Sequence, residues 1–341
     1  LPHTPPQGQS YFDENGKELP AQKTWDDQWI IAFDHVPAKG YRVFPLGIST
    51  QNANAEKTAD INGNRVQTDS YLFDFSDDME ITRLYCKKIG REVIPKGKVF
   101  NRLIAFEEMP YQDNNWNTNA YFEEKSEIVS HVINARVLEN GPVRAVLLIS
   151  RAYHNSIIKQ YLTLYKNSER IDIVNEIDWK EDCTILKAEF PVDVNTDKAT
   201  YDIQFGNLER PTHSNTLADF AKFEASAQKW ADMSDNSFGV SILNDCKYGY
   251  NIKDGKIRLS LLRSQNCPQE KQDQKKHIFT YSIYPHAGFV ADSDTVRHAL
   301  CLNVPLIGVE ATGRGSLPTN FSLLACDRDN IIIETIKKAE D

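Results

Sequence analysis

The sequence has no long apolar run and no cluster of basic residues. No window approaches the roughly 18 consecutive apolar residues of a membrane-spanning helix, so we expect no transmembrane segment. With 39 Lys and Arg against 48 Asp and Glu, the formal net charge is -9. An acidic chain without a basic face argues against nucleic acid and anionic membrane surfaces as partners.

Signatures of several enzyme classes are also missing. The chain contains no G-x-G-x-x-G, no G-x-x-x-x-G-K-[ST] and no G-x-S-x-G, so dinucleotide binding, P-loop chemistry and serine hydrolase chemistry have no support in the sequence. Its eight histidines include no H-x-x-x-H or H-E-x-x-H pair. We therefore predict no metal site in this chain.

Cysteine is scarce, with six residues spread along the chain and no C-x-x-C pair. This pattern favours separate reduced thiols over a disulfide framework, and we expect a cytoplasmic protein. Residues 1–10 have neither an initiator Met nor an apolar signal core, so we also expect a piece of a longer protein.

The sequence does contain many short segments in which apolar and polar residues alternate. Examples are SEIVSHVINARVLE, VRAVLLISRAYH, SIIKQYLTLYK and RIDIVNEIDW, with turns about 10 to 15 residues apart. Asn62-Gly63 and Asp254-Gly255 are typical of hairpin turns. Because helical periodicity is rare, the pattern predicts an antiparallel all-β fold.

Two regions depart from the main β pattern. Residues 29–46 predict two strands around a turn at residues 37–40, which we interpret as the end of a small β unit. Residues 214–230, SNTLADFAKFEASAQKW, are compatible with helix or strand. We place one domain boundary after residue 48, with a small β-sandwich end and linker at 1–48 and one large β domain at 49–341.

Residues 205–250 combine aromatic, amide and charged side chains between short apolar runs. Aromatic rings can cover the apolar face of a pyranose, while amides, carboxylates, Arg and His bond its hydroxyl rim. Groups of this kind are Arg210, His213, Asn215, Trp230, Asp232, Asn244, Asp245, Lys247 and Tyr248.

Each of these residues also has a purely structural interpretation. Arg210 precedes a proline and fits a salt bridge at a turn. A lone His213 is more often a satisfied core or surface residue, and Trp230 and Tyr248 are more often packing residues. Residues 244–249 read first as a turn that ends a strand.

The chain resembles the C-terminal half of glycoside hydrolase family 38 α-mannosidases, in the cytosolic, vacuolar and bacterial branch. The resemblance rests on AEFPVDVNTDKATYDIQFGNLERPTHSNT, FEASAQKWADMSDNSFGVSILNDCKYGY, LSLLRS and HIFTYSIYPHAG. Earlier pieces such as VPAKGYRVFPL, NRLIAFEEMP and NGPVRAVLLIS agree, so the resemblance covers nearly the whole chain in order.

The resemblance implies an antiparallel supersandwich like that of galactose mutarotases. Family members carry their zinc ligands and catalytic aspartates in an N-terminal α/β barrel, which has no counterpart here, so no catalytic residue is assigned to this chain. The implied partners are that barrel and an α-mannoside or oligosaccharide. The expected substrate-binding residues are Arg210, His213 and Asn215, with Asp232, Asn244 and Asp245 behind them.

Three functions therefore remain open at the level of sequence. The first is the β domain of a retaining α-mannosidase, inactive alone. The second is a stand-alone carbohydrate-binding module. The third is a mutarotase-like epimerase that uses His213 or His286 with a glutamate, which rests on fold analogy. The sequence also leaves a homo-oligomer open.

Overall fold

The computed structural model describes residues 5–49, 56–108, 115–116, 118, 121–311, 315–328 and 330–340. Its described residues form two compact units. Residues 56–307 make the larger unit, and residues 5–49 group with residues 308–340 in the smaller one. The sequence did not indicate that the C-terminal segment groups with the N-terminal one. The domain boundary after residue 48 stays a prediction.

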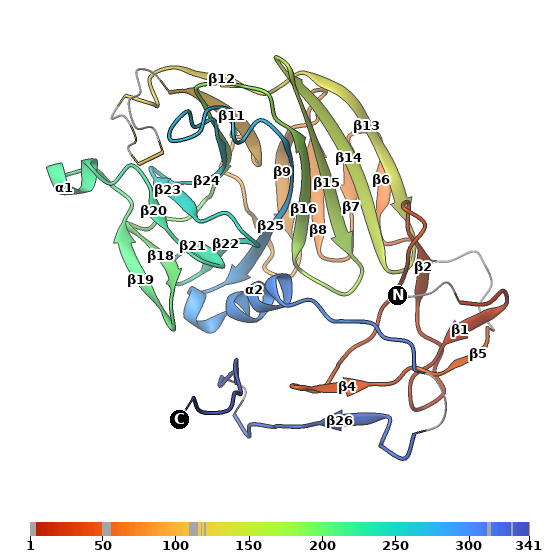
Figure 1. Cartoon of the computed structure of the whole chain (residues 1–341). Helices are drawn as coiled ribbons and strands as arrows, with labels where there is room; N and C mark the ends of the chain where they lie inside the picture. The colour runs from red at the N-terminus through yellow and green to blue at the C-terminus, as the bar shows by residue number, and fades with distance from the viewer. Residues whose placement is uncertain are drawn as a thin grey trace. The chain divides into compact units, whose positions relative to one another are not determined.

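A nine-stranded antiparallel sheet dominates the larger unit (Figure 1). Its spatial order is β13 (Val132–Asn140), β14 (Arg144–Tyr153), β15 (Ser156–Tyr165), β16 (Ile171–Asp178), β25 (Lys276–Ala287), β22 (Phe238–Asn244), β21 (Trp230–Ser234), β18 (Lys198–Ile203) and β19 (Gly206–Pro211). β18 and β19 form a hairpin at the end of this sheet.

Two smaller antiparallel sheets complete this unit. The six-stranded sheet has the order β12 (Ser126–Ile128), β11 (Arg102–Glu107), β17 (Thr184–Pro191), β24 (Lys256–Arg263), β23 (Gly249–Lys253) and β20 (Ala225–Ser226). The five-stranded sheet has the order β10 (Arg91–Glu92), β9 (Ile81–Cys86), β8 (Tyr71–Phe75), β7 (Arg65–Gln67) and β6 (Asp60–Asn62).

Helices are short in the described part of the chain. They are α1 (Leu217–Phe220), the 3-10 helix η1 (Val290–Asp292) and α2 (Thr295–Asn303). None of the described helices has the length and apolar character needed to cross a bilayer. The smaller unit contains the paired strands β1 (Gln9–Tyr11) and β5 (Leu46–Ile48), β2 (Ala21–Lys23) and β3 (Trp29–Ile31), and β4 (Gly40–Arg42) and β26 (Asn320–Ser322).

One cluster of buried side chains joins all three sheets of the larger unit. At its centre, Phe190 on β17 meets Phe100 edge to face at 5.2 Å and Tyr281 on β25 at 5.7 Å between ring centres. Alternate residues of a strand point to opposite faces, so Leu186, Ala188 and Phe190 of β17 enter this core together. The predicted all-β antiparallel fold is confirmed.

The predicted hairpin turns are present. The first hairpin turn lies one residue later than predicted, at Gly63-Asn64, because Asn62 is the last residue of β6 and pairs with Arg65 of β7. Asp254-Gly255 joins β23 to β24 with both residues at positive φ, as a tight hairpin requires. The ambiguous stretch 214–230 contains only the single-turn α1 and the two-residue β20 before β21 begins at Trp230. Thr216 is the N-cap residue of α1, and its side chain accepts a hydrogen bond from the backbone N–H of Asp219.

Replacing Phe190 by alanine should destabilise the larger unit by about 3 to 5 kcal/mol, because it leaves a cavity where two sheets meet. Urea denaturation of the purified chain measures this loss. Phe289→Ala is the matched control, since Phe289 is 49% exposed and its removal opens no cavity. Equal effects of the two substitutions would contradict the central role of Phe190.

Candidate functional site

Arg210 lies on β19, the outermost strand of the nine-stranded sheet, and faces Tyr201 on the neighbouring β18. Its guanidinium carbon is 5.6 Å from the centre of the Tyr201 ring. Its Nε is buried and has no hydrogen-bond partner among the described residues. A buried donor without a partner costs free energy, so Arg210 marks a place where a further acceptor fits.

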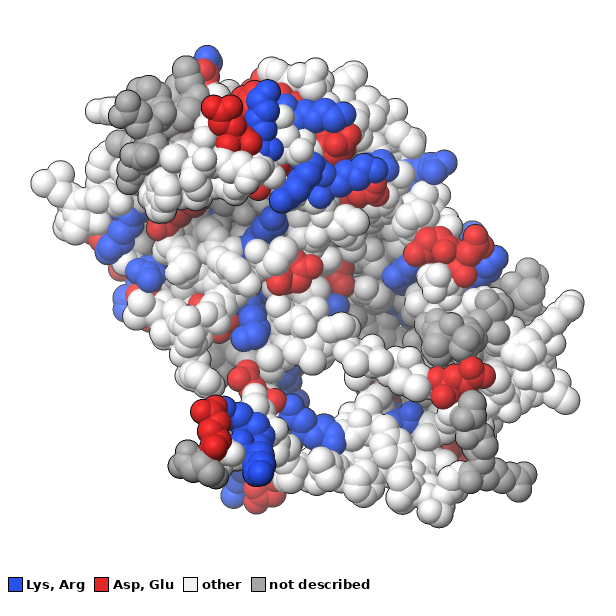
Figure 2. Space-filling view, in the orientation of Figure 1, with Lys and Arg blue, Asp and Glu red and all other residues white. Residues whose placement is uncertain are grey.

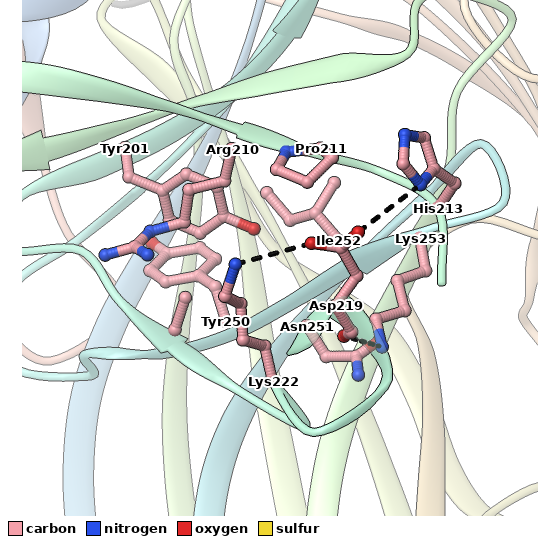
Figure 3. A pocket seen from close by; sticks show the side chains of 11 residues that line it. Tyr201, Arg210, Pro211, His213, Asp219, Lys222, Tyr250, Asn251, Ile252 and Lys253 are labelled. Carbon is pink, nitrogen blue, oxygen red and sulfur yellow. Dashed lines mark hydrogen bonds and ion pairs between the residues drawn. The ribbon is translucent and has the colours of Figure 1, made fainter. Parts of the chain in front are cut away.

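Arg210 and His213 line the same narrow pocket, which also contains residues of α1 and β23 (Figure 3). The lining residues are Tyr201, Arg210, Pro211, His213, Asp219, Lys222, Ala225, Tyr250, Asn251, Ile252 and Lys253. The free volume is about 20 Å³, which has room for about one water molecule and not for a sugar ring. By itself this pocket can only be one wall of a larger site.

His213 is oriented by its own loop. Its Nδ1 accepts a hydrogen bond from the backbone N–H of Asn215 at 3.4 Å, and Asp219 Oδ2 lies 4.0 Å from the same nitrogen. The hydrogen bond from Thr216 and the nearby Lys222 lower the pKa of Asp219, which Figure 3 shows between His213 and Lys222. Arg210 and His213 thus line one pocket, whereas Asn215 contacts His213 and does not line it. Sugar binding by these three residues stays a prediction.

Asp232 lies elsewhere, in the interior of the nine-stranded sheet. It is fully buried, and its Oδ2 is 2.8 Å from His286 Nε2 and accepts a hydrogen bond from Ser241 at 2.8 Å. Ser241 in turn contacts the hydroxyl of Thr295 on α2 at 2.7 Å. This network ties α2 to three strands. In this structure neither Asp232 nor the buried His286 offers a free surface to a ligand.

Asn244 and Asp245 end β22 and fix the turn that follows it. Asn244 is fully buried, and its Nδ2 donates to the Gln228 carbonyl at 3.0 Å and to the Tyr250 hydroxyl at 2.8 Å. Asp245 Oδ2 accepts a hydrogen bond from the Thr280 backbone N–H at 2.9 Å, while its Oδ1 is buried without a partner among the described residues. Sugar contacts by these two residues stay a prediction.

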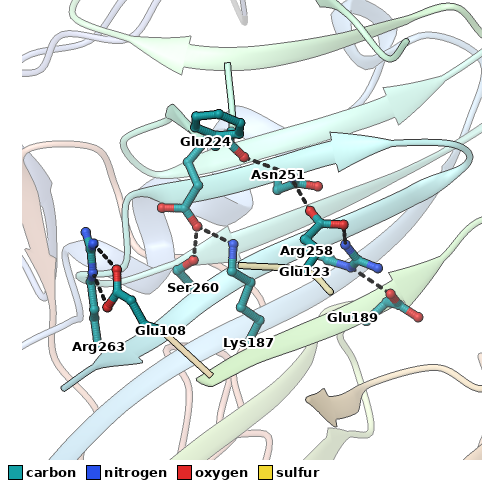
Figure 4. Close-up of polar contacts among 10 residues, drawn as sticks. Glu108, Glu123, Lys187, Glu189, Glu224, Asn251, Arg258, Ser260 and Arg263 are labelled. Atoms are coloured by element: carbon teal, nitrogen blue, oxygen red, sulfur yellow. Dashed lines mark hydrogen bonds and ion pairs between the residues drawn. The ribbon is translucent and has the colours of Figure 1, made fainter. Parts of the chain in front are cut away.

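A buried lysine on the six-stranded sheet is a feature that the sequence did not reveal (Figure 4). The side chain of Lys187 on β17 is only 1% exposed, and its Nζ lies 2.5 Å from Glu224 Oε1 and 4.5 Å from the centre of the Phe122 ring. Burial lowers the pKa of Lys187, although Glu224 opposes this shift. Burial by itself would raise the pKa of Glu224, but Lys187 and a hydrogen bond from Ser260 outweigh it and lower the pKa.

Further ion pairs continue along the same face of this sheet. Arg258 on β24 bonds Glu189 through Nε at 2.7 Å and Glu123 through Nη1 at 3.0 Å, and Arg263 pairs with Glu108. Residues 121–124 and 223–226 supply carboxylates and rings to this layer, so β17 is buried on both faces. Alternating charges in a strand normally indicate a solvent face, which is why the sequence gave no sign of the covering segments.

Residues 66–271 match the model of the glycosyl hydrolases family 38 C-terminal domain. The chain belongs to glycoside hydrolase family 38. It is 36% identical to alpha-mannosidase G of Dictyostelium discoideum and 34% identical to human alpha-mannosidase 2C1. Each alignment covers 76% of this chain and 25% of the relative, so the chain spans about a quarter of the length of these relatives.

Solved structures agree with the family 38 fold. An alpha-mannosidase from Enterococcus faecalis V583 superposes with a TM-score of 0.77 over 94% of this chain and 42% of its own, at 16% identity. A second Enterococcus faecalis protein of glycosyl hydrolase family 38 gives a TM-score of 0.73 at 15% identity. At these identities the likeness establishes the fold alone. Arg210, His213 and Lys187 all lie inside the segment that matches the family.

Within the described residues, no group of three or more His, Cys, Asp or Glu side chains could hold a metal ion. The six cysteines are free, in agreement with the expectation of separate thiols. Lys and Arg side chains lie beside Asp and Glu side chains at several places on the face shown in Figure 2. Because the described residues bring no such group of ligands together, they do not fit a zinc ion.

Replacing Glu224 by glutamine should destabilise the larger unit by about 1 to 3 kcal/mol near neutral pH, because the buried amine of Lys187 loses its carboxylate partner. The pKa of Glu224 in the folded protein is lower than its ordinary value of 4.5. The stability that ionised Glu224 contributes is therefore fully present above pH 4.5, and it is lost as the pH falls through the folded-state pKa. The difference in unfolding free energy between the original chain and the Glu224→Gln variant should therefore become smaller in acid. Urea denaturation at several pH values measures it.

Glu209→Gln is the matched control, since Glu209 and its partner Lys198 are each 60% exposed. An exposed pair contributes less than about 1 kcal/mol. A Glu224→Gln variant as stable as this control at neutral pH would show that the ion pair between Lys187 and Glu224 contributes nothing to the stability of the fold.

Proposed function

We propose that this chain is the C-terminal β part of a retaining α-mannosidase and acts together with a separate catalytic part. The match to the family 38 C-terminal domain carries the proposal, together with relatives named alpha-mannosidase that are about four times longer than the aligned segment. The proposed substrate is an α-mannoside or oligomannoside, and the proposed main partner is the N-terminal catalytic barrel of the same protein. The proposed location is the cytoplasm.

The proposed division of labour follows from the chemistry of glycoside hydrolysis. A retaining enzyme needs a nucleophilic carboxylate and an acid/base carboxylate about 5 Å apart. Both are proposed to lie in the catalytic part, as is the zinc ion that family resemblance implies. This chain would then bind and orient the sugar and exclude water from one side of the site.

Arg210 is the proposed contact between this chain and the substrate. Support comes from its buried Nε, which lacks a partner among the described residues, and from His213 in the same pocket. Since the pocket holds about one water molecule, a sugar hydroxyl could occupy it only from a site completed by other residues. Asn215 would orient His213 through their hydrogen bond. Asp232, Asn244 and Asp245 would act indirectly, by stabilising the strands and turns that carry the site.

In the longer protein that carries the catalytic part, Arg210→Ala should lower kcat/KM for an aryl α-mannoside about 10- to 100-fold, because a charge-assisted hydrogen bond to the sugar is lost. Arg136→Ala is the matched control, since Arg136 lies exposed on β13. An Arg210 variant that keeps the full kcat/KM would remove Arg210 from the proposed site.

The 341-residue chain alone should not hydrolyse α-mannosides, with or without added zinc, because it is proposed to lack both carboxylates. A sensitive assay with a fluorogenic α-mannoside measures this. Turnover that disappears when a residue of this chain is replaced would contradict the proposal, whereas turnover that survives every such replacement would indicate a contaminant.

A further inference from the structure

A second, larger groove opens on the other side of the strands that form the Arg210 pocket. Tyr201 and Ala225 line the pocket, whereas the next residues along the chain, Asp202 and Ser226, line the groove. Successive residues of a strand point to opposite faces, so the two sites lie back to back across β18 and β20. The groove has a volume of about 490 Å³, within the range of small-molecule sites.

The side chains of the groove are those that recognise a sugar. Its principal members are Asp202, Gln204, Gln228, Lys229, Tyr248 and Asn303. The amides of Gln204 and Gln228 and the ammonium group of Lys229 can bond neighbouring hydroxyls as donors and acceptors. Asp202 and Asn303 already hold the walls of the groove through their own hydrogen bonds. The Tyr248 side chain, which is 55% exposed, can cover the apolar face of a pyranose.

We propose that this groove is a second carbohydrate-binding site, which takes a pyranose residue of an α-mannoside away from the point of cleavage. The choice of mannoside rests on the proposed function, while the assignment to a sugar rests on the chemistry of the groove. The site would hold a remote part of an oligosaccharide or retain the protein near its substrate.

The walls of the groove are fixed to one another before any ligand arrives. The backbone N–H of Lys229 donates to Asp202 Oδ2 at 2.8 Å, and the N–H of Gln228 donates to the Asp202 carbonyl at 3.0 Å. These bonds hold the loop before β21 against β18. A groove whose walls need no rearrangement binds a ligand with a smaller loss of entropy.

The turn that carries Tyr248 is held in the same way. Asn244 Oδ1 accepts the backbone N–H of Lys247 at 2.8 Å, and Asn303 Nδ2 donates to the Asn244 carbonyl at 2.9 Å. The backbone N–H of Ala227 donates to the Tyr248 carbonyl at 3.0 Å. Asn244 therefore positions the aromatic ring of the groove although its own side chain is buried.

The hairpin tip next to the groove carries another exposed aromatic residue. Phe205 follows the lining residue Gln204, is fully exposed and has a φ of 58°. This left-handed conformation favours Gly or Asn, and a bulky residue there is an outlier. Phe205 contributes nothing to the core, so packing does not explain an aromatic side chain at this strained position.

The test is titration of the purified 341-residue chain with methyl α-mannoside and α-mannobiose, followed by protein-detected NMR or calorimetry. We expect saturable binding, and Tyr248→Ala should weaken it about tenfold by removing the ring that covers the sugar. Tyr121→Ala is the matched control, because Tyr121 is an exposed tyrosine outside the groove, and it should leave the affinity unchanged. Thermal unfolding of each variant checks that it is folded.

Each outcome separates this groove from the Arg210 pocket. Absence of binding at high sugar concentration, or equal affinity of the Tyr248→Ala and Tyr121→Ala variants, would overturn the groove. Binding that is lost in Arg210→Ala and kept in Tyr248→Ala would also overturn it, while supporting the proposed function. Binding lost in Tyr248→Ala, with full hydrolysis by an Arg210→Ala variant of the longer protein, would support the groove and overturn the role of Arg210.

Discussion

The edge-to-face contact of Phe190 and Tyr281 joins the six-stranded and nine-stranded sheets at the centre of the larger unit. Both rings are fully buried, and Phe100, which follows the five-stranded sheet in the chain, packs on Phe190 from a third direction. Aromatic rings bury a large area and prefer this geometry, so the contact fixes the distance and the relative orientation of the sheets. The hairpins and turns that carry the polar sites are extensions of these fixed sheets.

The opposite face of β17 adds a second constraint of a different kind. There Lys187 lies among carboxylates and rings instead of an apolar layer. A buried ion pair contributes little net stability compared with apolar packing, but it is satisfied by only one arrangement of partners. The pair links Glu224, which directly precedes the end strand β20, to β17 in the same sheet. The chain around Glu224 contributes to both polar sites, because Ala225 lines the pocket and Ser226 lines the groove.

The sequence predicted the parts of the structure that depend on local pattern. Alternation indicated the strands, and Asp254-Gly255 indicated a tight turn. Burial of Asp232 was not predictable, because its partners His286 and Ser241 come from other strands.

The same limit applies to the buried lysine and to the groove. Lys187 alternates with apolar neighbours, as a solvent-facing residue of an amphipathic strand would, and only distant segments cover it. The groove combines Asp202, Tyr248 and Asn303, which are about 100 positions apart at the extremes. Local pattern specifies elements, whereas sites such as this one depend on which elements become neighbours in three dimensions.

The position of β19 at the end of the nine-stranded sheet has a consequence for self-association. No described strand pairs with its outer side, so its free N–H and C=O groups could template the addition of a foreign strand. The strand is only six residues long, carries the charged Glu209 and Arg210, and ends at Pro211, which has no N–H to donate. Arg210, the proposed sugar contact, thus also helps to protect the sheet from aggregation along its open edge.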